Sequence, residues 1–87
     1  MEAQQIAEKV RAGIPRAEVE AVCIGGDDHF EVTVVSDAFD GQSMVAQHRM
    51  VYAALGDAMR SEIHALVIKT MTPDQYRQGL VTDIERT

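Results

Sequence analysis

Tryptophan is absent from this 87-residue chain, cysteine occurs once, as Cys23, and no apolar run is long. A single cysteine excludes an internal disulfide, which is typical of a protein from a reducing compartment. A membrane-spanning helix needs about 20 mostly apolar residues, and no such stretch occurs. The first residues also lack the basic-then-apolar layout of a signal peptide. We therefore expect a cytoplasmic protein without membrane contact, forming one domain over residues 1–87 with an ordered core over about residues 2–84.

Positive charge is scarce as well. Eight lysine and arginine residues stand against 14 aspartate and glutamate residues, which gives a formal net charge of −6. Nucleic-acid binding depends on basic side chains that neutralise phosphates, and the basic residues here are scattered. The charge disfavours a nucleic-acid partner without excluding one, because folding can gather distant charges on one surface.

The first segment has the apolar spacing of a helix. Ile6, Val10 and Ile14 recur every four residues, which indicates a helix over about residues 2–12 that ends at Gly13.

Two strands are predicted next, over about residues 18–24 and 29–36, because apolar and polar residues alternate in both. The glycines and aspartates at residues 25–28 indicate a turn between them. Strands joined by so short a turn should pair as an antiparallel hairpin.

The second half begins with a loop over residues 37–42. Apolar residues at helical spacing then predict a helix over about residues 44–55, which Gly56 interrupts before a short turn through residue 60. A nearly continuous apolar run predicts a third strand over residues 63–71.

The last segment begins with a capping box formed by Thr72 and Gln75, with proline at the first helical position. We expect a final helix that carries Tyr76, Leu80 and Ile84 on one stripe.

The fold class is therefore α+β, with the order α-β-β-α-(short α)-β-α. The helical connection between strands two and three implies a crossover, and hence a three-stranded mixed sheet covered by helices on one face. The other face should show Glu18, Glu20, Val22, Ile24, Glu31, Thr33 and, in part, Lys69.

No residue pattern points to an enzyme. No nucleophile stands at a recognisable spacing from a base, and Ser43 is better explained as a helix cap. Gly25 and Gly26 are followed by acidic residues, which would repel a phosphate.

The number of donor atoms limits metal binding. A [2Fe-2S] cluster takes four ligands, normally thiolates, some of which histidine can replace. The chain has three histidines and one cysteine. His48 falls in mid-helix and Cys23 is expected in the sheet packing, so all four should not converge. Two histidines would suffice if a partner protein supplied thiolates.

The candidate histidines also have structural interpretations. The residues alone favour His64 as a partly buried histidine at the start of the third strand. By itself His29 is a solvated turn residue, although Asp27 or Asp28 could orient its ring.

Cys23 is interpreted as a small buried residue, but a shift of its strand by one residue would turn it outward as a competing ligand. His48 should pack within its helix. We prefer Arg49 as an anchor for the loop over residues 37–40, with a contact to a partner or nucleic acid as the alternative. His48 and Lys69 would share such a surface.

Several segments, in this order and spacing, resemble the signature of the BolA family over nearly the whole chain. They are Phe39, Gly41 and Ser43; His48, Arg49, Val51 and Tyr52; Ile63, His64, Ala65 and Leu66; and Lys69, Thr70, Thr72 and Pro73. The chain departs from the family at Gln42, where lysine is usual, and at Tyr76, where tryptophan is usual. The first removes a positive charge, and the second should keep an aromatic core residue.

The resemblance implies a fold similar to a class II KH domain and a role as an adaptor. BolA-like proteins pair with monothiol glutaredoxins and share a [2Fe-2S] cluster with them, the glutaredoxin adding its cysteine and a bound glutathione. The histidine matching His64 is the usual ligand of this family, and a second comes from the loop between the first two strands. That loop contains His29, with Cys23 as a competing candidate. The chain thus resembles the subgroup with a histidine-bearing loop, which includes the bacterial acid-stress proteins.

Two other functions remain open. Some family members are described as transcription regulators, so nucleic-acid binding through the helix over residues 43–55 is the first alternative, although the Gly-x-x-Gly clamp of KH domains is absent. A protein-interaction domain that works without metal is the second. No cofactor is expected on the isolated chain, and a weak homodimer is a further option.

Overall fold

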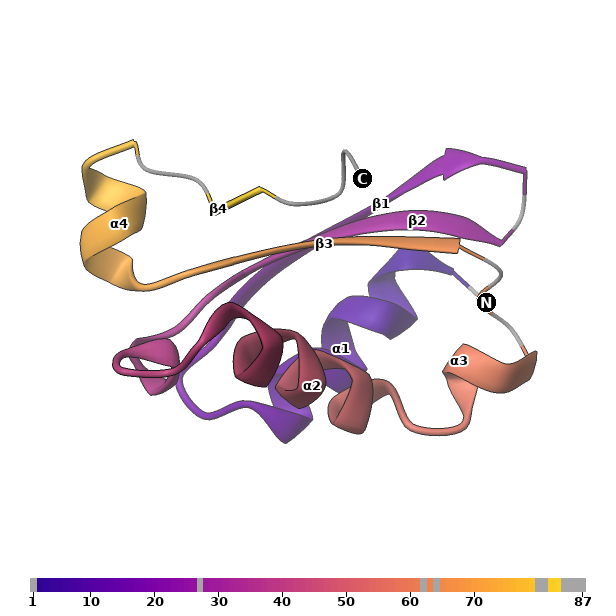
Figure 1. Ribbon diagram of the computed structural model, residues 1–87. Coiled ribbons are helices and arrows are strands. Elements are labelled where there is room, and N and C mark those ends of the chain that lie inside the picture. Colours follow the sequence, from indigo (N-terminus) through magenta and orange to yellow (C-terminus); the bar gives the residue numbers. More distant parts are fainter. Residues whose placement is uncertain (1, 27, 62, 64, 80–81, 84–87) are drawn as a thin grey trace.

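The computed structural model describes residues 2–26, 28–61, 63, 65–79 and 82–83 (Figure 1). Within these residues, no helix has the length and apolar content needed to cross a bilayer. The elements are, in chain order, α1 (Ala3–Gly13), β1 (Glu18–Gly25), β2 (His29–Val35), the 3-10 helix η1 (Asp37–Phe39), α2 (Met44–Leu55), α3 (Ala58–Ser61), β3 (Ala65–Met71), α4 (Pro73–Arg77) and β4 (Thr82–Asp83).

The sheet is mixed, as predicted. Its strand order is β1-β2-β3-β4, with β1 antiparallel to β2 and β3 parallel to β2. Parallel strands cannot be joined by a tight turn, so the chain crosses over through α2 and α3 before it returns as β3. The two-residue β4, which the sequence did not predict, pairs antiparallel with Lys69 and Thr70 of β3.

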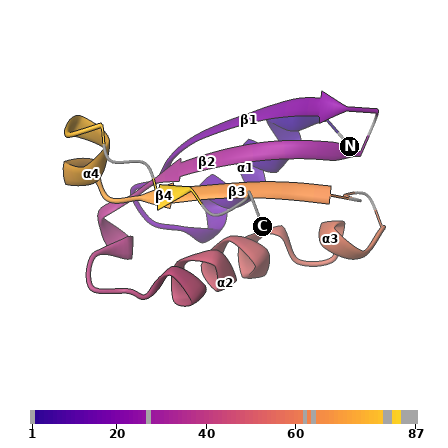
Figure 2. The ribbon, with the colours of Figure 1, turned by 45° about the horizontal axis from the view of Figure 1, so that its top comes forward.

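Helices α1 and α2 lie on the same face of the sheet (Figures 1 and 2). Their apolar residues meet the inward side of β2 in one core, because residues four apart on a helix and two apart on a strand share a face. The residues of this cluster that are at most 1% exposed are Ile6, Val10, Ile14, Phe30, Val32, Val34, Phe39, Val51 and Leu55. A capping box between Glu2 and Gln5 begins α1.

The opposite face of the sheet is less covered. On β1, Glu18, Glu20 and Val22 are exposed, while Glu31 and Thr33 of β2 are half-buried. Ile24 is exposed and Lys69 is half-buried, so this face carries the predicted residues.

The C-terminal helix is shorter than predicted. The capping box of Thr72 and Gln75 is present, but α4 ends at Arg77 and Gly79 adopts a left-handed φ of 76°. The prediction of a long apolar stripe was therefore wrong, and Leu80 and Ile84 lie outside the described residues. Tyr76 was expected in the core but is 60% exposed.

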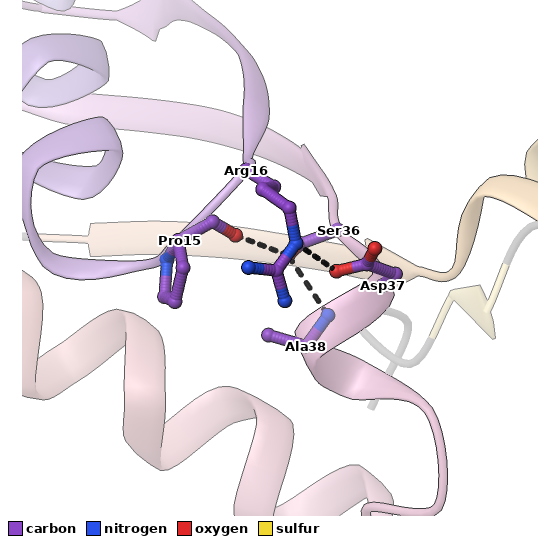
Figure 3. Close-up of polar contacts among 5 residues, drawn as sticks. All are labelled: Pro15, Arg16, Ser36, Asp37 and Ala38. Carbon is purple, nitrogen blue, oxygen red and sulfur yellow. Dashed lines mark hydrogen bonds and ion pairs between the residues drawn. The ribbon is translucent and has the colours of Figure 1, made fainter.

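A buried polar corner joins the start of β1 to the end of β2 (Figure 3). Ser36 is fully buried; its hydroxyl donates to the Pro15 carbonyl at 2.7 Å and accepts from the Ala38 N–H at 3.1 Å. The Arg16 Nε donates to Asp37 Oδ1 at 2.7 Å, from a backbone with a φ of 56°. Arg16 thus anchors the loop that the sequence assigned to Arg49, and that assignment was wrong.

Gly13 lies where α1 passes closest to α2. A Cβ built on Gly13 would stand 2.6 Å from the Ala54 Cβ and 3.0 Å from its Cα. Gly13 has no left-handed φ among the described backbone angles. Close packing against α2 therefore requires glycine at position 13, whereas the turn that follows the helix does not.

We expect Gly13→Ala to lower the free energy of unfolding by about 1–3 kcal/mol, because overpacking at backbone contact exceeds the gain in helix propensity. Gly25→Ala is the matched control, since its Cβ would meet nothing closer than 3.9 Å. Urea denaturation of the three proteins measures the difference. A Gly13→Ala protein as stable as the wild type would show that the two helices are not in close contact.

Candidate metal centre

The β1–β2 hairpin end of the sheet holds His29. It is the first residue of β2, where it faces Gly25 of β1 on one side and Ala65 of β3 on the other. His64 precedes Ala65 in the sequence and lies outside the described residues. The parallel register therefore places His29 beside the residue that follows His64.

His29 stands on the open face of the sheet. Phe30, its neighbour, is buried at 1% exposure, whereas the His29 side chain is 45% exposed. Its Nε2 lies 3.5 Å from Asp28 Oδ1. A carboxylate that accepts the N–H of one imidazole nitrogen favours metal binding at the other nitrogen. Asp28 lies at ion-pair distance from the ring. That it orients the ring for a metal stays a prediction, and Asp27 lies outside the described residues.

Cys23 is exposed, so its assignment to the sheet packing was wrong. The register of β1 against β2 shifts between Cys23 and Gly25, and the Cys23 Sγ donates to the Gly26 carbonyl at 3.1 Å. Cys23 itself stays in register opposite Phe30, and its thiol is exposed near the end of β1. Cys23 therefore stays a competing candidate ligand.

Within the described part of the chain, no three His, Cys, Asp or Glu side chains gather where they could hold a metal ion. His29 and Cys23 both lie at the hairpin end of the sheet, although Cys23 pairs with Phe30, whose side chain is on the other face from His29. A metal centre at this end would need its remaining ligands from another molecule.

The sequence assigned three further residues to a partner surface, and they differ in exposure: Arg49, Lys69 and His48. Arg49 is exposed on α2, whereas Lys69 is half-buried and pairs with Glu31 at 3.0 Å. His48 is half-buried, and among the described residues its Nε2 is buried without a hydrogen-bond partner. Desolvation by burial lowers the pKa of His48. Of the three, Arg49 is the residue best placed to reach another molecule.

A family model for BolA-like proteins matches residues 9–75, which include every candidate residue. The chain belongs to the BolA family.

Relatives in this family resemble the chain in both sequence and fold. BolA-like protein 1 from Mus musculus is 42% identical over 64 residues, 74% of this chain and 47% of the relative. The chain thus spans about half the length of that curated relative. The structure of a BolA homologue from Coxiella burnetii superposes with a TM-score of 0.78 at 40% identity, covering 88% of this chain and 97% of the other.

Other BolA relatives have names that suggest different roles. A protein from Vibrio cholerae, 42% identical over 65 residues, 75% of this chain and 61% of its own length, is named a DNA-binding transcriptional regulator. The BolA domain of SufE1 from Arabidopsis thaliana superposes with a TM-score of 0.73 at 36% identity, covering 84% of this chain and 93% of that domain. The family therefore includes both a protein named for DNA binding and a domain within a SufE protein.

Sequence reasoning missed a buried polar network beside this BolA signature. Thr70, which is fully buried, donates its hydroxyl to Gln47 Oε1 at 2.6 Å. The Gln47 Nε2 donates to the Gln42 carbonyl at 2.9 Å. These bonds tie β3 to α2 and to the loop before α2. Gln47 stands four residues before Val51, on the buried face of the helix. A polar side chain on a buried helix face needs a hydrogen-bond partner, so the sequence carried a signal of this network.

Acid should weaken the fold through His48. Its pKa is lower in the folded chain than in the unfolded chain, so the unfolded state takes up more protons as pH falls. The stabilisation is complete above the unfolded-state pKa, about 6.5, and is lost as pH falls through the folded-state pKa. We expect His48→Gln to show a smaller loss of stability than the wild type between pH 7.5 and 5.5, measured by urea denaturation. Equal losses in both proteins would assign the pH dependence to other groups.

Proposed function

We propose that this BolA-family chain is a non-enzymatic adaptor that pairs with a monothiol glutaredoxin and helps to bind a bridging [2Fe-2S] cluster. His64 would supply one ligand and His29 the second. The glutaredoxin cysteine and a bound glutathione thiolate would supply the other two. The role would lie in assembly, trafficking or sensing of iron–sulfur clusters.

The observation that carries this proposal is the register of β2 and β3. His29 pairs with Ala65, and the peptide bond joins Ala65 to His64. Strand pairing therefore brings His29 beside the residue that follows His64 in the sequence. This neighbour supports the choice of His64 and His29 as a pair of ligands.

The donor set supports a shared site over a self-contained one. A [2Fe-2S] cluster takes four ligands, and the described residues do not gather three. Two imidazoles leave two positions for thiolates of a partner. Asp28, 3.5 Å from the Nε2 of His29, would hold that ring in the tautomer a metal needs.

The test is to reconstitute the cluster anaerobically with a monothiol glutaredoxin and glutathione, with and without the chain, and to record visible absorption and circular dichroism. We expect the wild-type chain to change the spectrum and His64→Ala to abolish that change. His29→Ala should shift the spectrum and speed cluster loss about tenfold or more, as loss of a metal-site contact typically does.

Cys23→Ser is the control that separates the two candidate loop ligands. It should leave the spectrum as in the wild type if His29 is the ligand. A spectrum that changes with Cys23→Ser and not with His29→Ala would show that Cys23, and not His29, is the loop ligand. An unchanged glutaredoxin spectrum on addition of the wild-type chain would contradict the proposal.

Nucleic-acid binding is the second candidate, because the Vibrio cholerae relative is named for it and Arg49 is exposed on α2. The footprint would be small, since Lys69 pairs with Glu31 and Arg60 lies 3.7 Å from Asp57. Such binding would weaken steeply with salt. A metal-independent interaction domain, the third candidate, would bind glutaredoxin equally well after loss of both histidines.

A further inference from the structure

Exposed apolar side chains lie beside His29. Val22 is 43% exposed and Ile24 is 54% exposed, both on β1. Scattered exposed apolar residues are ordinary on a protein surface, but neighbouring ones beside polar groups are typical of interaction sites.

The strand register places Val22 on the open face, and Ile24 lies in the irregularity that follows. Val22 pairs with Glu31, and Glu31 pairs with the half-buried Val67 of β3. Glu31 is two residues from His29, so both side chains are on the same face of β2. Ile24 immediately precedes Gly25, the hairpin partner of His29. Because Gly25 has no side chain, nothing from that position separates the imidazole from β1.

The apolar residues are bordered by negative charge. Glu18 and Glu20 are exposed on β1. Glu31 is partly neutralised by Lys69, 3.0 Å away, and those two side chains are only 30% and 24% exposed. Glu20 and Glu31 near Val22 therefore outnumber Lys69, whereas Arg16 and Arg77 line a pocket with Glu18 at the far end of β1.

We infer that Val22 and Ile24 form the apolar centre of the surface on which the thiol-bearing partner docks, with Glu20 on its rim. This inference rests on the proposed function. Helices α1 and α2 cover the other face of the sheet, so the open face is the side from which a protein would bring thiolates to His29 (Figure 1). Its own surface should be apolar at the centre and carry lysine or arginine at the edge facing Glu20, since complementary charge steers association.

A second copy of the chain fits this surface less well. Two copies would bring the same glutamate-rich strand together and would add no thiolate to the two imidazoles except Cys23. The carboxylates therefore favour a partner with basic residues over self-association.

The experiment measures binding of the metal-free chain to a glutathione-loaded monothiol glutaredoxin by isothermal titration calorimetry. Val22→Gln, Ile24→Gln and the double variant are compared with the wild type. Val45→Gln is the matched control, because Val45 is 61% exposed on α2, on the covered side of the sheet. All the substituted side chains are exposed, and urea midpoints close to the wild type would show that the variants are folded.

We expect the double variant to weaken binding about tenfold or more, as the loss of central apolar contacts does, and Val45→Gln to change it less than twofold. Glu20→Gln should weaken binding a few-fold at low salt with little change at high salt. Wild-type affinity in the double variant would overturn the inference. The inference would also be overturned by a double variant that loses self-association in sedimentation experiments but keeps its affinity for glutaredoxin.

Cluster reconstitution with the same proteins separates this inference from the proposed function. If the wild type binds glutaredoxin through Val22 and Ile24 but forms no shared cluster, the docking surface stands and the ligand proposal fails. If the shared cluster forms equally well with the double variant at limiting protein concentration, the ligand proposal stands and the docking surface fails.

Discussion

The parallel pairing of β2 and β3 is the constraint on which the rest of this structure depends. It requires a long crossover, and α2 in that crossover packs beside α1 on one face of the sheet. It also fixes His29 opposite Ala65. A slip of one residue would turn His29 toward the core and Phe30 toward solvent, because side chains alternate between the faces of a strand. Packing of the core and placement of the candidate ligands are thus set by the same register.

This arrangement divides the molecule into two sides with different tasks. One side is closed by α1 and α2, and buried polar side chains there form internal bonds from Thr70 to Gln47 and from Ser36 to Pro15. The other side stays open around His29, with apolar residues and carboxylates on β1. A domain this small buries only about 60–65% of its unfolded surface, so leaving one sheet face open limits the size of its core. A smaller core is consistent with an open face that binds a partner.

Regular patterns in the sequence were enough to predict the helices α1 and α2, the hairpin, the mixed sheet and the capping box at Thr72, because apolar periodicity and caps are local signals. Features that depend on contacts between elements were not predictable in this way. Cys23 is exposed near the end of β1, and Gly13 is needed because Ala54 of another helix approaches it. Arg16, 21 residues before Asp37 in the sequence, bonds to it across the fold. His29 was identified from its place in the hairpin, whereas its alignment with Ala65 required the register.

The central claim is that this chain lends imidazole nitrogen to a cluster whose thiolates belong to another protein. Pulsed electron paramagnetic resonance of the reduced complex, with histidine labelled by ¹⁵N only in this chain, tests it most directly. The account predicts ¹⁵N couplings from two directly bound imidazoles, one of which disappears in His29→Ala. A reduced [2Fe-2S] cluster in the complex without any ¹⁵N coupling from this chain would contradict it.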